Sequence, residues 1–164
     1  MIAMNKRLST FAMAVLVLSG CAQGEKPFFA PSLSDLQDKS QLAGADQAVH
    51  MGKYPHAERM LAQYVSRNDS GQLRMKYFGI SRENSKHAID TVVMLLWETG
   101  RDDSLKQFAK DYLSGQEYQT TLCRISERQA KYEEAYHCWN QMGEIDRAER
   151  VVRTEAALRI LSTP

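Results

Sequence analysis

The sequence predicts an all-α fold, an irregular stack of about seven antiparallel helices. Apolar residues recur at intervals of three and four positions, which places them on one face of an α-helix. Runs of β-branched residues are almost absent, and Pro and Gly are sparse after residue 31. These observations together favour helices over strands along most of the chain.

The first 20 residues have the layout of a cleavable leader. Lys6 and Arg7 supply a short basic stretch, and an apolar run without charge follows from Phe11 to Leu18, as in a secretory signal peptide. This run is shorter than the roughly 20 apolar residues that a membrane-spanning helix needs. We therefore expect residues 1–20 to be removed, and we expect no permanent transmembrane span.

The end of the leader contains a cysteine in a recognisable setting. Leu18-Ser19-Gly20-Cys21 resembles the lipobox of bacterial lipoproteins, in which an apolar residue and two small residues precede the cysteine. The resemblance implies that Cys21 is lipidated and that its acyl chains hold the protein on the membrane. In the lipoprotein family, an Asp directly after the lipidated cysteine changes the membrane to which the protein is sorted. Residue 22 is Ala, so the resemblance further implies an outer-membrane lipoprotein whose domain faces the periplasm. The alternative is a secretory leader with an incidental cysteine.

Residues 21–34 are expected to form a tether, because two prolines and a glycine interrupt regular structure there. Residues 35–164 then suffice for one helical domain with one core. The whole chain has 21 Lys and Arg against 20 Asp and Glu. This near-neutral balance gives no electrostatic reason to expect a nucleic-acid partner.

Four small residues precede apolar stripes at matching offsets along the domain. The first stripe residue follows five positions after the small residue, and the others follow at helical spacing. Such internal repetition is typical of stacked helical hairpins. The four small residues are Gly52, Gly100, Ala130 and Gly143.

These stretches resemble the second half of a tetratricopeptide repeat, and the segment from Ala130 to Trp139 ("AKYEEAYHCW") is the closest copy. The resemblance implies helical hairpins and a protein-binding role. The small residues are unevenly spaced, whereas the family repeats every 34 residues or so, so we expect a compact irregular stack. Its last three helices should span residues 118–129, 132–142 and 145–161.

The segment from Asn68 to Asn84 is an insertion relative to a regular repeat. We expect it to carry a helix of its own around Leu73 to Tyr77. Its apolar pair Tyr77-Phe78 has no obvious core role, which makes both residues candidate partner contacts. Trp97 and Trp139 lie on apolar stripes, so we interpret both as core residues.

The two remaining cysteines, Cys123 and Cys138, lie equally far from the turn expected at Ala130 and Lys131. They therefore face one another across an antiparallel helix pair, and we predict a disulfide. Two buried thiols are the alternative, because free cysteine packs as a small apolar residue. A zinc site would need two further ligands, and none is apparent, so no metal is expected.

No catalytic motif stands out in the sequence. It contains no H-E-x-x-H, no G-x-S-x-G and no glycine-rich phosphate loop. The acidic pairs Asp102-Asp103 and Glu133-Glu134 begin expected helices, where a carboxylate interacts favourably with the helix dipole. We therefore expect no enzyme activity and no cofactor.

The resemblances imply a lipid-anchored, periplasm-facing protein-binding module that acts as an assembly or stability factor of an envelope secretion or pilus machine. The tetratricopeptide-like pilotins, which escort secretin pores, are lipoproteins of this kind, so a secretin or another secretion or pilus component is the expected partner. The first alternative is a permanent accessory subunit of a conjugation, secretion or polysaccharide-export complex. A small-ligand carrier or an enzyme is a more distant one.

Overall fold

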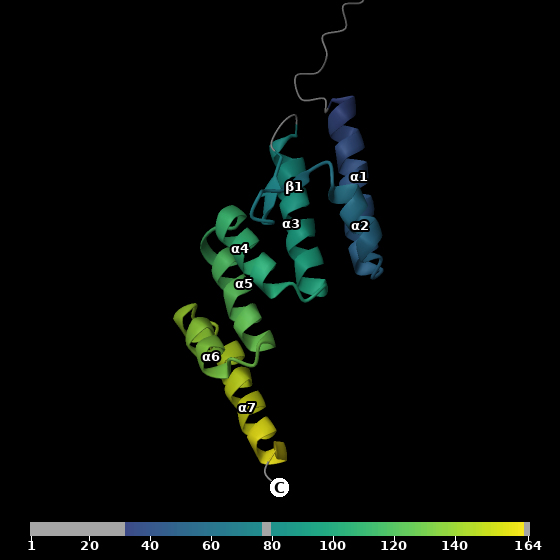
Figure 1. The fold of residues 1–164 in the computed structure, drawn as a ribbon. Coiled ribbons are helices and arrows are strands. Elements are labelled where there is room, and N and C mark those ends of the chain that lie inside the picture. Colours follow the sequence, from purple (N-terminus) through teal and green to yellow (C-terminus); the bar gives the residue numbers. More distant parts are fainter. Residues whose placement is uncertain (1–31, 77–79, 163–164) are drawn as a thin grey trace, which may run out of the picture. The chain divides into compact units, whose positions relative to one another are not determined.

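The computed structural model describes residues 32–76 and 80–162, and this part of the chain forms seven α-helices and one short β-hairpin (Figure 1). The all-α prediction is confirmed. In chain order the elements are α1 (Leu33–His50), α2 (Tyr54–Leu61), β1 (Val65–Arg67), β2 (Leu73–Met75), α3 (Arg82–Glu98), α4 (Asp102–Tyr112), α5 (Gly115–Arg128), α6 (Tyr132–Gln141) and α7 (Ile145–Ser162). Within the described residues, no helix has both the length and the apolar character needed to cross a membrane.

Helix α1 begins slightly before the expected domain boundary at residue 35. The Ser32 hydroxyl accepts a hydrogen bond of 3.1 Å from the Asp35 N–H, and the Asp35 carboxylate accepts one from the Ser32 N–H in return. This capping box satisfies two backbone donors that the first turn of a helix leaves unpaired. The serine therefore fixes the start of the helix at Leu33.

The four small residues singled out in the sequence all lie at helix-to-helix turns of one geometry. Their φ angles are positive: 70° at Gly52, 66° at Gly100, 57° at Ala130 and 75° at Gly143. At each turn the next N–H donates to the carbonyl five residues back over 2.8–3.0 Å, which closes the preceding helix. Five positions after each small residue, the first residue of the next stripe is buried; these residues are Ala57, Leu105, Ala135 and Ala148.

The start of the inserted segment forms the turn and the second strand of a β-hairpin, so the helix expected around Leu73 to Tyr77 was wrong. Strands β1 and β2 pair antiparallel, with Val65 opposite Met75. Asn68 determines the turn, because its side-chain oxygen accepts hydrogen bonds from the N–H groups of Ser70 and Gln72 over 3.1 and 2.8 Å. An Asn side chain that bonds the backbone in this way favours a turn over a helix.

Two apolar cores organise the packing of the helices. The N-terminal core is built by α1 to α4 and the hairpin, and its largest fully buried side chains include Tyr64 and Phe108. The C-terminal core lies among α5, α6 and α7 around Trp139. Helix α5 belongs to both, because its Ile125 lies in the first core and its Cys123 in the second.

The helices pack mainly against their neighbours in the chain. Helix α1 packs against α2 and α3, and α6 packs against α5 and α7 (Figure 1). The starts of α1 and α3 are tied together, since the buried Asn84 amide donates to the Asp35 carbonyl over 3.0 Å. Lys39 and Glu83 form an ion pair of 3.1 Å beside it.

Candidate functional site

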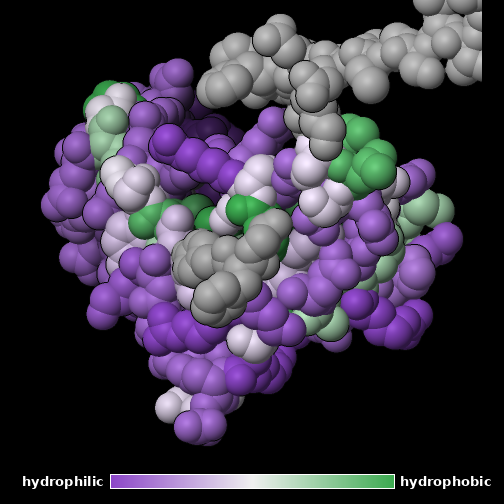
Figure 2. Space-filling view, turned by 90° about the horizontal axis from the view of Figure 1, so that it is seen from above, coloured by the Kyte–Doolittle hydropathy of each residue, from purple (hydrophilic) through white to green (hydrophobic). Residues whose placement is uncertain are grey.

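An apolar groove lies between α3 and α5, with α4 beneath it. Its volume is about 630 Å³. We call it the α3–α5 groove. Its apolar lining consists of Val93, Met94, Trp97, Leu105 and Leu113. Hydrophilic residues cover most of the molecular face shown in Figure 2, where apolar residues form only small separate patches.

Two polar contacts join α3 to α5, one at each end of the groove. Lys86 Nζ lies 3.4 Å from Glu117 Oε1, and Arg128 Nη1 donates to the Trp97 carbonyl over 2.5 Å. Both contacts join residues separated by 31 positions, so the two helices run in the same direction. Hydrogen bonding to Asp90 is the main cause that raises the pKa of Lys86. The lysine therefore stays charged at this end of the groove.

The groove remains open because α5 presents polar side chains to an apolar face of α3. Gln116, Thr120 and Thr121 line it from α5, whereas Met94 and Trp97 line it from α3. Short hydroxyl side chains do not fill the space that a pair of leucines would fill. The apolar side chains of α3 consequently stay available to a further molecule.

Trp97 is held in place at the edge of the groove by two guanidinium groups from α5. The guanidinium carbon of Arg128 lies 3.7 Å from the indole centroid, and that of Arg124 lies 4.5 Å from it. Burial lowers the pKa of Arg128, and the same side chain forms an ion pair with Asp102. Stacking and pairing together fix the orientation of the indole.

The sequence interpretation of the two tryptophans is therefore only half right. Trp139 is 1 % exposed and forms the centre of the C-terminal core. Trp97 is partly buried against the N-terminal core and also lines the groove. Asp102, expected only to favour the start of a helix, also binds Arg128.

A second hollow lies beside the groove, between α5 and α7. Its volume is about 370 Å³, and its lining is polar. We call it the arginine pocket. The residues that line it are Thr120, Arg124, Glu127, Arg147 and Arg150. Thr120 and Arg124 also line the α3–α5 groove, so the two hollows adjoin.

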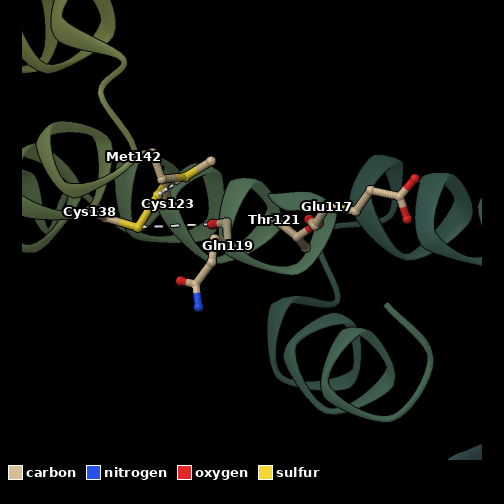
Figure 3. The surroundings of a disulfide bond; sticks show 6 residues. All are labelled: Glu117, Gln119, Thr121, Cys123, Cys138 and Met142. Carbon is tan, nitrogen blue, oxygen red and sulfur yellow. Dashed lines mark hydrogen bonds between the residues drawn. A yellow bond between two sulfur atoms is a disulfide. The ribbon is translucent and has the colours of Figure 1, made fainter. Parts of the chain in front are cut away.

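The structure pairs Cys123 with Cys138 in a disulfide between α5 and α6, as the spacing predicts (Figure 3). The Cα atoms lie 5.4 Å apart, a separation typical of disulfides. Met142 Sδ lies 3.5 Å from the Cys123 sulfur, and the Gln119 carbonyl oxygen lies 3.9 Å from the Cys138 sulfur. The link therefore joins the buried core residue Cys123 to the partly buried Cys138, and neither cysteine lines the groove.

Several sequence-predicted features take up structural positions. Glu133 and Glu134 lie in the first turn of α6, as expected. Across residues 32–76 and 80–162, no three His, Cys, Asp or Glu side chains come close enough to hold a metal ion.

Three residues with an expected role lie outside the described residues. They are the lipidation candidate Cys21 and the candidate partner contacts Tyr77 and Phe78. The groove, in contrast, was missed. Its signal in the sequence is a contrast between two helices. The second half of α3 is apolar on all sides from Val92 to Trp97, whereas α5 carries the polar residues Gln116, Glu117, Thr120 and Thr121 on one face.

Comparison of the chain with protein-family models, with curated proteins and with solved structures finds no match.

Proposed function

We propose that the chain is a lipid-anchored, periplasm-facing protein-binding module that acts as an assembly or stability factor of an envelope secretion or pilus machine. The α3–α5 groove is the observation that carries the binding part of this proposal. The anchoring part rests on the lipobox at Leu18 to Cys21. The pilotin-like role rests on the resemblance of the helical hairpins to tetratricopeptide repeats.

The dimensions of the groove suit a polypeptide segment. Along α3 its lining runs from Asp90 to Glu98, a length of about 12 Å at the helical rise. About four residues of an extended chain have this length. Apolar grooves between helices bind such segments by burying a few apolar anchors.

A permanent accessory subunit of a conjugation, secretion or polysaccharide-export complex is the second candidate. It would use the same groove and the same anchor. The two functions differ in stoichiometry, because an accessory subunit stays in the finished complex at a fixed ratio and an assembly factor leaves it. A small-ligand carrier is a third possibility, since the groove volume lies within the range of ligand sites.

Cross-linking in membranes tests the proposal. The lipidated protein is cross-linked mildly, purified from detergent extracts and analysed by mass spectrometry beside a Cys21→Ser variant. We expect one dominant envelope partner, misplaced when Cys21 is replaced. A normally placed partner in the Cys21→Ser strain would contradict the anchoring role, and no reproducible protein partner would favour the carrier.

A matched pair of variants tests whether the groove is the binding surface. Met94→Glu places a charge among the apolar residues of the groove, whereas Met51→Glu places the same charge on a methionine that is 56 % exposed and outside the groove. We expect Met94→Glu to abolish cross-linking of the partner and Met51→Glu to preserve it. Equal partner recovery from both variants would remove the groove from the proposal.

A further inference from the structure

The arginine pocket contains more positive than negative charge. Arg124, Arg147 and Arg150 line it together with a single carboxylate, that of Glu127. Other arginines of α5 and α7 are neutralised locally: Arg128 pairs with Asp102, and Arg153 pairs with Glu149 at 2.8 Å. The adjoining α3–α5 groove is lined by the carboxylates of Asp90, Glu98 and Glu117, so the excess of positive charge lies in the arginine pocket and not in the groove.

Two of the three arginines of the pocket have no ion-pair partner among the described residues. Within residues 32–76 and 80–162, Arg124 and Arg150 form no ion pair, and Arg147 lies 3.7 Å from Glu144. Guanidinium groups gain most from bidentate hydrogen bonds to carboxylates or phosphates. The pocket thus presents three guanidinium groups but only one carboxylate, that of Glu127, so its lining holds more donors than its own carboxylate can pair.

Two of the three guanidinium groups are already oriented by stacking. Arg124 stacks on Trp97 at 4.5 Å, and Arg147 stacks on Trp139 at 4.6 Å. Stacking uses the flat face of a guanidinium and leaves the N–H groups at its edge free to donate. Less side-chain entropy is therefore lost when an anion binds to these two residues.

The groove and the pocket form one continuous surface. Thr120 and Arg124 line both, so a chain that fills the groove and passes across α5 enters the pocket. The net charge of the whole chain is only +1, which gives no general attraction to an anionic surface. The local pattern of apolar residues followed by arginines instead matches a polymer with apolar and acidic residues in succession.

We propose that the α3–α5 groove and the arginine pocket together bind a polypeptide segment whose apolar side chains fill the groove and whose adjoining Asp or Glu carboxylates enter the pocket. This inference rests on the proposed protein-binding function and names the chemistry of the partner. Arg124 and Arg150 donate to the carboxylates, and Met94 and Trp97 contact the apolar anchors.

Selection from a random peptide library tests the partner chemistry directly. The full-length lipidated protein is immobilised in detergent and presented with displayed 12-residue peptides, and the bound peptides are sequenced. We expect the selected peptides to be enriched in Asp and Glu next to Leu, Phe or Trp. Enrichment of apolar residues alone would overturn the acidic-segment proposal but leave the protein-binding function standing, whereas no selection above background would count against both.

Variants then assign the selected chemistry to the pocket. Arg124→Gln and Arg150→Gln should each weaken a selected peptide about tenfold, as expected for the loss of one charge-assisted contact. Arg82→Gln combined with Arg153→Gln removes two exposed charges outside the pocket and should leave the affinity unchanged. Equal losses in the pocket and control variants would overturn the assignment.

A competition measurement separates peptide carboxylates from lipid phosphates. Phosphatidylglycerol is added to the detergent micelles, and the bound fraction of a labelled selected peptide is followed. We expect the peptide to stay bound. Displacement that disappears in Arg150→Gln would show that the pocket prefers an anionic lipid and would overturn the proposal.

Discussion

The two cores of this protein are built differently. The N-terminal core joins four helices and a hairpin and buries several large side chains, among them Tyr64, Leu96 and Phe108. The C-terminal core has one large fully buried side chain, Trp139, beside small residues such as Ala135 and Ala148, and the larger side chains packed against it are only partly buried. The disulfide lies in the second region. The comparison indicates that a covalent link compensates where little apolar surface is available.

Helix α5 is the structural link between the two regions. It contributes Ile125 to the N-terminal core and Cys123 to the C-terminal core, and its polar face borders both hollows. Loosening of the C-terminal region therefore changes the position of the residues that line the proposed binding surface. The following predictions test how far the two regions are independent.

Replacing Trp139 with alanine should have the largest effect. The indole is 1 % exposed, and removal of such a side chain typically costs about 3–5 kcal/mol. Because the chain has two tryptophans, the remaining fluorescence in this variant reports on Trp97 alone. We expect urea to unfold the C-terminal region early by circular dichroism, while Trp97 fluorescence changes at a higher urea concentration.

Coincident transitions in the two signals would show that the cores unfold as one unit. Phe108→Ala is the matched variant in the N-terminal core, where the ring is also 1 % exposed. It should shift the transition that Trp97 reports.

Loss of the disulfide should have the next largest effect. The link closes a loop with a sequence separation of 15, for which the chain-entropy model gives about 3 kcal/mol. Cys138→Ser should lower the melting temperature of the C-terminal region under oxidising conditions only. If the substitution lowers the melting temperature by the same amount in reductant, the thiol contributes by packing and the link does not stabilise the fold.

The core position of Trp139, the disulfide and the turns between the helices could be predicted from the sequence. The turns at Gly52, Gly100, Ala130 and Gly143 lie where the apolar stripes predicted them. Each turn needs a residue with a positive φ angle and a buried residue five positions later, and a short stretch of sequence shows both. The expected helix at 118–129 begins earlier, at Gly115, and ends at Arg128. Local signals therefore located the helices to within a few residues.

Features that depend on distant residues were harder to predict. The hairpin escaped notice because its strands are short and its turn depends on one Asn68 side chain. The groove forms because particular faces of α3 and α5 pack side by side. The sequence pattern of one helix does not show which face of another helix it will contact. The stacking of Arg124 on Trp97 results from the same packing of α5 against α3 and was missed for the same reason.

Alkaline pH should weaken the N-terminal core through Tyr64. Burial, followed by the hydrogen bond of 2.9 Å that the phenol donates to Asp38, raises the pKa of Tyr64 from 10.0 to about 12. The unfolded chain therefore loses this proton at a lower pH than the folded chain. The contribution is fully present below pH 10 and is lost as the pH rises towards 12, at no more than about 1.4 kcal/mol per pH unit.

Tyr64→Phe is the control for this pH dependence. The variant lacks the hydroxyl, so its free energy of unfolding should fall less steeply than that of the wild type between pH 10 and 12. Urea titrations at several pH values measure the difference. Parallel curves would show that Tyr64 does not cause the alkaline loss.

The smallest expected effect concerns the turn between α5 and α6. Ala130 has φ of 57°, a left-handed conformation that costs a residue with a Cβ about 1–2 kcal/mol. Ala130→Gly should therefore stabilise the C-terminal region by up to about 1 kcal/mol, once the larger chain entropy of glycine is subtracted. Thermal unfolding of the oxidised protein measures the gain.

Gly143→Ala is the reverse substitution at the next turn. A Cβ at Gly143 would meet no heavy atom within 4 Å, so only backbone strain acts, and we expect a loss of about 1 kcal/mol. A gain at Gly143 or a loss at Ala130 would contradict the shared turn geometry.

The packing of each helix against its neighbour in the chain has a consequence for how the protein acquires its structure. Helices α1 and α2, α5 and α6, and α6 and α7 are the pairs with the most extensive contact. Chains dominated by such short-range contacts fold rapidly, because little loop entropy is lost before each contact forms. The hairpin of α5 and α6 can therefore form before α7 packs against it, and its formation brings Cys123 and Cys138 side by side.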